Sequence, residues 1–241
     1  MAGREATRWT GPVAKRQATR STDTEIETMI RTRLFTAALL GTALAFGSFA
    51  AVMAPSEAFA QKAGGDKKGS GDSVRPEVGT PLQAAQALIG QKKYKEAMAK
   101  VKEADAVANK TPYEAGVVLQ FRVAVAQALG DAAELEKGLE GMVAAGTIPT
   151  AQQAQYALVI AQAYLTDKNY AKSISWAQKA ISQGGNETQA RAMLLQAYFE
   201  NKDYANAVKE MSNKIATAER AGQKPTQREL EILASLHLSN N

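Results

Sequence analysis

The sequence predicts an all-α protein built from repeated helix pairs. Alanine supplies 47 of its 241 residues, against 13 valines and 9 isoleucines, so the residue with the best helix propensity dominates the apolar content. Helix-start patterns recur at intervals of 31 to 40 residues, and short polar turns lie between them. The chain has no cysteine, so no disulfide can hold these helices together and their packing must do so.

The first 60 residues are predicted to lie outside the folded domain. The uncharged segment 34–56 follows two arginines and precedes the sequence Ala58-Phe59-Ala60. A basic start, an apolar middle and a small-x-small site are the three parts of a secretory signal peptide. We therefore expect residues 29–60 to be a signal peptide that is cleaved after Ala60, and the mature protein to be periplasmic.

An alternative for the same region is a retained membrane anchor. Residues 34–53 are long enough to span a bilayer as a helix, which would anchor the protein in the inner membrane facing the periplasm. Residues 1–28 are rich in Thr, Ser and Arg and poor in apolar residues, the composition of a disordered segment. They are either an extension from a wrongly assigned start codon, with translation beginning at Met29, or a cytoplasmic tail.

Residues 61–79 are predicted to be a flexible linker, because Gly, Ser, Lys and Asp dominate them. The folded domain is then expected over residues 80–241. The basic excess falls from five for the whole chain to three beyond residue 60, and the Lys and Arg residues there are dispersed. Because a nucleic-acid-binding face needs clustered positive charge, we expect no nucleic acid partner.

Five helix starts are predicted in this domain. Each has a Thr or Asn at the expected cap and a Gln or Glu three residues later, the arrangement that satisfies the first free backbone N–H groups. The expected caps are Thr80, Thr111, Thr150, Asn186 and Thr226. All prolines beyond residue 80 lie next to such a boundary, so none is expected inside a helix.

A second set of turns divides each interval into two helices. Each turn is short and polar, as between antiparallel helices. The turns are Gly90-Gln91-Lys92-Lys93, Gly130-Asp131, Thr166-Asp167-Lys168-Asn169 and Glu200-Asn201-Lys202-Asp203. The repeating unit is therefore a helix, a tight turn, a second helix and a longer link.

Residues 152–185 superpose on residues 186–219 at a shift of 34, and the superposed segments resemble the tetratricopeptide repeat (TPR) family. The matched pairs are Tyr164 with Tyr198, Tyr170 with Tyr204, Gln155 with Gln189, and Gln162 with Gln196. The resemblance extends over about 80–238, with Gly90, Tyr94, Ala97 and Ala104 carrying it in the first unit. It implies a right-handed α-solenoid of about four antiparallel helix pairs plus a C-terminal capping helix.

The resemblance also implies packing roles for small residues. Ser173 and Ala207 are expected where two paired helices approach most closely. The second unit, 111–146, departs from the pattern, because no tyrosine follows its turn. Gly138 and Gly141 are expected to loosen its second helix.

The closing segment 226–238 is expected to be the polar cap of the array. Leu230, Leu233 and either Leu236 or Leu238 would form its one apolar stripe. The end of a stacked array needs such a cap to stay soluble.

In the TPR family the first helix of each pair lines a concave groove that holds a peptide or a partner's helix. The resemblance therefore gives seven candidate partner-binding residues: Gln155, Val159, Gln162, Gln189, Met193, Gln196 and Phe199. The recurring glutamines would offer hydrogen-bond donors and acceptors without net charge. The alternative, that they are ordinary solvated glutamines, stays open at this point.

No motif in the sequence predicts catalysis, a metal site or a cofactor. A single histidine, His237, cannot build a multi-histidine site, and the absence of cysteine excludes thiolate chemistry. The sequence therefore predicts a non-enzymatic adaptor or scaffold of the bacterial cell envelope that binds a protein or peptide. The alternatives are a membrane-anchored envelope assembly factor and a cell-wall-associated binding module or enzyme accessory.

Overall fold

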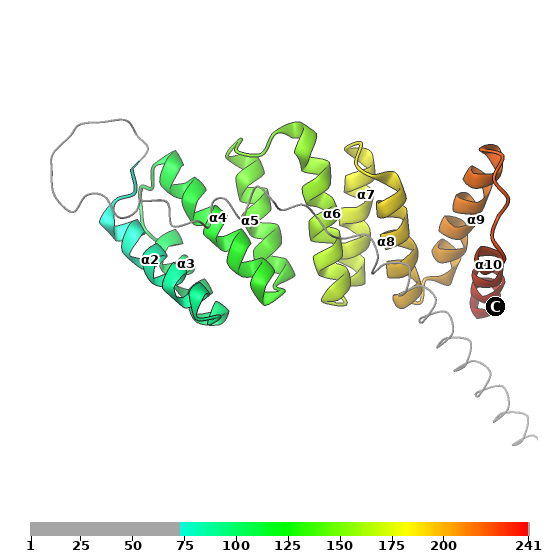
Figure 1. Ribbon diagram of the computed structural model, residues 1–241, viewed down its shortest axis with the longest axis horizontal. Helices are drawn as coiled ribbons and strands as arrows, with labels where there is room; N and C mark the ends of the chain where they lie inside the picture. Colours follow the sequence, from blue (N-terminus) through cyan, green and yellow to red (C-terminus); the bar gives the residue numbers. More distant parts are fainter. Residues whose placement is uncertain (1–72, 241) are drawn as a thin grey trace, which may run out of the picture. The chain divides into compact units, whose positions relative to one another are not determined.

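The computed structural model describes residues 73–240, and this part of the chain is all-α (Figure 1). It holds nine helices: α2 (Pro76–Gly90), α3 (Tyr94–Asp105), α4 (Pro112–Leu129), α5 (Ala132–Ala144), α6 (Thr150–Thr166), α7 (Tyr170–Ser182), α8 (Glu187–Glu200), α9 (Tyr204–Arg220) and α10 (Gln227–Asn240). The described residues up to Glu210 belong to one compact unit, and those from Met211 onward belong to another. The predicted extension 1–28, the predicted signal peptide 29–60 and most of the predicted linker lie outside the described residues.

Helices that follow one another in the chain pack against one another in the larger unit. The contacts run between α2 and α3, α3 and α4, α4 and α5, and so on to α8. Among the first helices, α2 also meets α4 and α6 also meets α8, whereas α4 and α6 are not in comparable contact. This sequential packing is consistent with a helical repeat array and agrees with the prediction of an all-α fold.

The four tight turns share one backbone feature. The residue two positions before each second helix adopts a left-handed conformation, with φ of 59° at Lys92, 71° at Gly130, 60° at Lys168 and 60° at Lys202. Only glycine adopts this conformation without steric cost, yet lysine occupies three of the four positions. The predicted turns are confirmed, and the turn of the divergent second unit has the same geometry as the others.

Three of the predicted caps are confirmed. Thr111 and Glu114 form a reciprocal capping box at the start of α4, and Thr226 and Glu229 do the same at α10. The Asn186 side chain accepts from the backbone N–H of Gln189 at 3.0 Å and caps α8.

The predicted caps at Thr80 and Thr150 are wrong. Helix α2 begins five residues earlier than expected, at Pro76, so Pro81 lies inside it and the last residues of the predicted linker are helical. Proline at the first helical position supplies the required φ, and the residue before it, Arg75, is held by contacts described below. In α6 the cap residue is Pro149, and Thr150 is already helical.

Small residues mark the helix crossings, as predicted. Ser173 in α7 is fully buried, and its hydroxyl donates to the carbonyl oxygen of Ala161 in α6 at 2.9 Å. A side chain can reach the backbone of its neighbour only where two helices approach closely. Ala207 is also fully buried.

The expectation that two glycines loosen α5 is wrong. A Cβ atom at Gly138 would lie 2.7 Å from Cγ2 of Val123, and one at Gly141 would lie 2.6 Å from Cδ2 of Leu119. Both contacts are shorter than van der Waals packing allows, so the glycines let α4 and α5 approach each other. The helix pair α4–α5 therefore packs through glycine at its crossing, whereas the pair α6–α7 packs through serine.

The predicted apolar stripe of the closing segment 226–238 is wrong. In α10, Ile232 and Leu236 are buried, but Leu230 and Leu238 are 48% and 68% exposed. The leucines expected on one stripe thus lie on two faces. No helix in residues 73–240 is long and apolar enough to cross a membrane.

Candidate functional site

The structure places the predicted groove residues on α6 and α8, two helices that contact each other. Gln155 is exposed, and four more of the seven are partly exposed: Val159, Gln162, Gln189 and Gln196. Met193 and Phe199 are only 6% and 4% exposed, so they are core side chains and offer little surface to a partner. Phe199 packs edge-on against Tyr204, with ring centroids 5.9 Å apart.

The exposed glutamines make few contacts of their own. The Gln162 amide lies 3.5 Å from the hydroxyl of Thr166, one turn further along α6. Within the described part of the chain, the amides of Gln155, Gln189 and Gln196 make no side-chain hydrogen bond. These groups therefore keep their donors and acceptors available to a partner or to water.

A second surface feature, which the sequence did not indicate, lies between α5, α6 and α7. It is a cleft of about 190 Å³ with mainly apolar walls. Its lining residues are Leu139, Glu140, Val143, Ala144, Gln153, Tyr156, Ala157, Ile160, Trp176, Lys179 and Gln183. The Lys179 ammonium lies 3.8 Å above the Trp176 ring and 3.7 Å from the Glu140 carboxylate, so it covers one aromatic face.

The cleft and the predicted groove use different sides of α6. Gln153, Tyr156 and Ile160 line the cleft at helical spacing, whereas Gln155, Val159 and Gln162 would line the groove. A helix turns about 100° per residue, so the two rows are well separated around it. The sequence shows that Tyr156 and Ile160 share one face of the helix. It does not show whether that face is buried in the core or lines a cleft.

A polar network centred on Glu136 lies beside the cleft and joins α5, α6 and α7. One carboxylate oxygen accepts from Tyr164 OH and from Lys172 Nζ at 2.7 Å, and the other accepts from Trp176 Nε1 at 2.9 Å. Burial favours the neutral form of Glu136, but the hydrogen bonds from Lys172, Tyr164 and Trp176 outweigh it and lower the pKa of the carboxyl. The network connects the three helices, and each of these polar groups has a hydrogen-bond partner.

A second charged network surrounds Arg122 in α4, whose side chain is 1% exposed. Its guanidinium donates to Asp105 Oδ2 of α3 at 2.6 Å and to the Glu134 carboxylate of α5. Lys102 Nζ also lies 2.6 Å from Glu134. Arg122 Nε is buried without a partner, so this network joins three helices at some desolvation cost.

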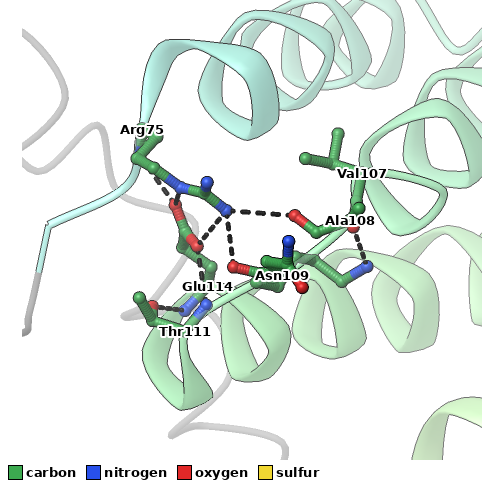
Figure 2. Close-up of polar contacts among 7 residues, drawn as sticks. Arg75, Val107, Ala108, Asn109, Thr111 and Glu114 are labelled. Carbon is green, nitrogen blue, oxygen red and sulfur yellow. Dashed lines mark hydrogen bonds and ion pairs between the residues drawn. The ribbon is translucent and has the colours of Figure 1, made fainter.

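The third network anchors the start of the domain (Figure 2). Arg75 donates to both carboxylate oxygens of Glu114, at 2.8 and 3.0 Å, and its Nη2 donates to the Asn109 carbonyl at 2.9 Å. The Glu114 carboxylate also accepts from the backbone N–H of Arg75 and of Thr111. The ion pair with Arg75 and these backbone hydrogen bonds lower the pKa of Glu114 to about 2.

These networks join neighbouring parts of the helical domain. Residues 73–240 hold no cluster of three His, Asp or Glu side chains that could bind a metal ion. His237 is exposed on α10. The arrangement offers two separate surfaces: a row of glutamine amides on α6 and α8, and an apolar cleft on another side of α6.

The chain matches no protein-family model, no curated protein and no solved structure. The class that the fold and site define is an all-α domain of sequentially packed helix pairs.

Proposed function

We propose that this protein is a non-enzymatic adaptor of the bacterial cell envelope, whose helix pairs form a right-handed, TPR-like solenoid that binds another protein. The observation that carries the proposal is the contact between first helices, α2 with α4 and α6 with α8. Such a contact places two first helices side by side, and the surface that α6 and α8 form together is the proposed binding surface for a peptide or helix.

The partner-binding residues in this proposal are Gln155, Val159, Gln162, Gln189 and Gln196. Their side chains are exposed or partly exposed, and they carry no charge. Amides that can donate and accept suit the backbone of an extended peptide, which presents both kinds of group.

The direct test is quantitative affinity purification from an envelope extract. The groove variant combines Gln155→Ala, Gln162→Ala and Gln196→Ala, and it should lose at least about tenfold of the recovered partner, a loss of about 1.4 kcal/mol in binding. The matched control combines Lys137→Ala and Ser175→Ala, exposed residues of second helices. Equal recovery by the two variants would contradict the groove assignment.

Export is a separate part of the proposal with its own measurement. N-terminal sequencing of protein from the periplasmic fraction should begin at Gln61, as expected after signal cleavage. A membrane-bound protein that retains residues 34–53 would instead support the anchored assembly factor.

A further inference from the structure

The cleft between α5, α6 and α7 has room for one large apolar side chain. Its volume of about 190 Å³ is smaller than the roughly 300–1,000 Å³ of pockets for drug-sized ligands, but an apolar cavity of roughly 150 Å³ already holds benzene. Leu139, Val143 and Ile160 are among its apolar walls. Trp176 forms a fixed wall, because its Nε1 donates to Glu136 at 2.9 Å. A preformed apolar cleft of this size fits an aromatic or branched aliphatic group.

Two charged residues of opposite sign line this cleft, Glu140 of α5 and Lys179 of α7. Their charged atoms are 3.7 Å apart, and both side chains are about half exposed. Within residues 73–240 neither charged end makes a hydrogen bond, so each can still bind a charged group of a ligand. A ligand with only a carboxylate would be repelled by Glu140, and a ligand with only an ammonium group would be repelled by Lys179. A ligand with one group of each sign complements both residues.

We infer that the cleft binds a free α-amino acid with a large apolar side chain, such as phenylalanine or leucine. In an α-amino acid the nitrogen and the nearer carboxylate oxygen lie about 3 Å apart, because the N–Cα and Cα–C bonds join them. The Lys179 and Glu140 charges have a similar separation, so the two charges of the ligand can lie beside them in alternating order. The ligand carboxylate then accepts from Lys179, its ammonium group donates to Glu140, and its side chain enters the cleft.

This site is independent of the proposed protein-binding surface. The row of glutamines on α6 and α8 lies on another side of α6 from the cleft. Loss of amino-acid binding would therefore leave the adaptor function untested, and loss of a protein partner would leave the amino-acid site untested.

Titration of the purified full-length protein with phenylalanine tests the site. The readout is the indole N–H signal of Trp176 in a two-dimensional proton–nitrogen NMR spectrum, assigned by its loss in Trp176→Phe. The signal should shift with a dissociation constant of about 1 mM or lower, as the size of the ligand allows. N-acetylphenylalanine, which lacks the ammonium group, and phenethylamine, which lacks the carboxylate, should each bind at least about threefold more weakly.

Two variants separate the roles of the two charges. Lys179→Gln should raise the dissociation constant of phenylalanine at least about threefold without weakening the binding of phenethylamine. Glu140→Gln should do the same to phenylalanine without weakening the binding of N-acetylphenylalanine. Lys137→Gln, at an exposed position of α5 outside the cleft lining, is the matched control and should bind phenylalanine as the wild type does. All three side chains are exposed, so the variants should keep the helical circular dichroism spectrum of the wild type.

Two results would overturn the inference. The first is a Trp176 signal that does not shift up to about 10 mM phenylalanine, tenfold above the expected dissociation constant. The second is equal affinity for phenylalanine and for the uncharged N-acetylphenylalanine amide, which would indicate a cleft that accepts an apolar side chain of a protein instead.

Discussion

The helix pairs α4–α5 and α6–α7 make the same kind of contact with opposite charges. Each first helix buries a large side chain whose polar end meets the second helix, Arg122 in α4 and Tyr164 in α6. The third residue of each second helix reaches that polar end, Glu134 in α5 and Lys172 in α7. The first pair therefore buries a full positive charge, whereas the second buries a neutral phenol and leaves its lysine half-exposed. The two helix pairs pack in the same way although the charges in these contacts differ. The loss of unfolding free energy on removing the contact should, however, differ between the two pairs.

The largest expected difference comes from removing the buried polar end in each pair. Arg122→Met should lower the free energy of unfolding by about 2–4 kcal/mol, because the mostly buried Glu134 and the partly exposed Asp105 each lose a charged partner. Tyr164→Phe should cost only about 1 kcal/mol, the worth of an ordinary hydrogen bond. Urea unfolding followed by circular dichroism measures both. Equal losses of unfolding free energy in the two variants would show that the charge of Arg122 adds nothing to the strength of the contact.

The second-largest difference in stability is expected at the helix crossings. Gly138→Ala should lower the free energy of unfolding by about 1–3 kcal/mol, because the new methyl group would meet the stiff side chain of Val123 at 2.7 Å. Gly116→Ala in α4 is the matched control. A Cβ atom there has no neighbour within 4 Å, so the higher helix propensity of alanine should stabilise the protein by about 0.5–1 kcal/mol. The same sign for both variants would contradict the glycine crossing.

Acid should affect the ion pair at the start of α4. The folded-state pKa of Glu114 is lowered to about 2 from an ordinary value of 4.5, so the ionised carboxylate stabilises the fold above pH 4.5. That contribution is lost as the pH falls from 4.5 toward 2. The stability difference between wild type and Glu114→Gln should therefore be greatest near neutral pH and shrink across this window.

Thermal unfolding at several pH values measures the Glu114 difference. Glu103→Gln, which removes an exposed carboxylate of α3, is the matched control substitution. A constant difference for Glu114→Gln would mean that its ion pair with Arg75 is not formed in solution.

The order of helices and turns could be predicted from the sequence because it depends on local chemistry. The tight turns and the caps at Thr111 and Asn186 are determined by hydrogen bonds within a few residues. The start of α2 could not be predicted, since the contact that holds Arg75 comes from Glu114, 39 residues away. The residues around Arg75 do not reveal a contact with a carboxylate so far away in the sequence.

The candidate site was predicted less well, for a related reason. Helical spacing tells which residues share a face of α6 or α8 but not which neighbour covers that face. Met193 and Phe199 share the expected rows and are nevertheless buried. The cleft depends on three helices at once, and its lining residues Trp176, Lys179 and Tyr156 come together only in the folded chain. Glycine was misjudged in α5 because its role is set by Val123 and Leu119 across the crossing.

The smallest expected difference in stability between the two helix pairs comes from their turns. Gly130 in the α4–α5 turn and Lys168 in the α6–α7 turn both have positive φ. A side chain in that conformation costs about 1 kcal/mol or more, and glycine avoids the cost but loses more entropy on folding. Lys168→Gly should therefore stabilise the protein by about 0.5–1 kcal/mol, and Gly130→Ala should destabilise it by about 1 kcal/mol. If Lys168→Gly is instead destabilising, the lysine side chain must contribute a compensating contact, and the two turns would be equivalent in backbone shape but not in energy.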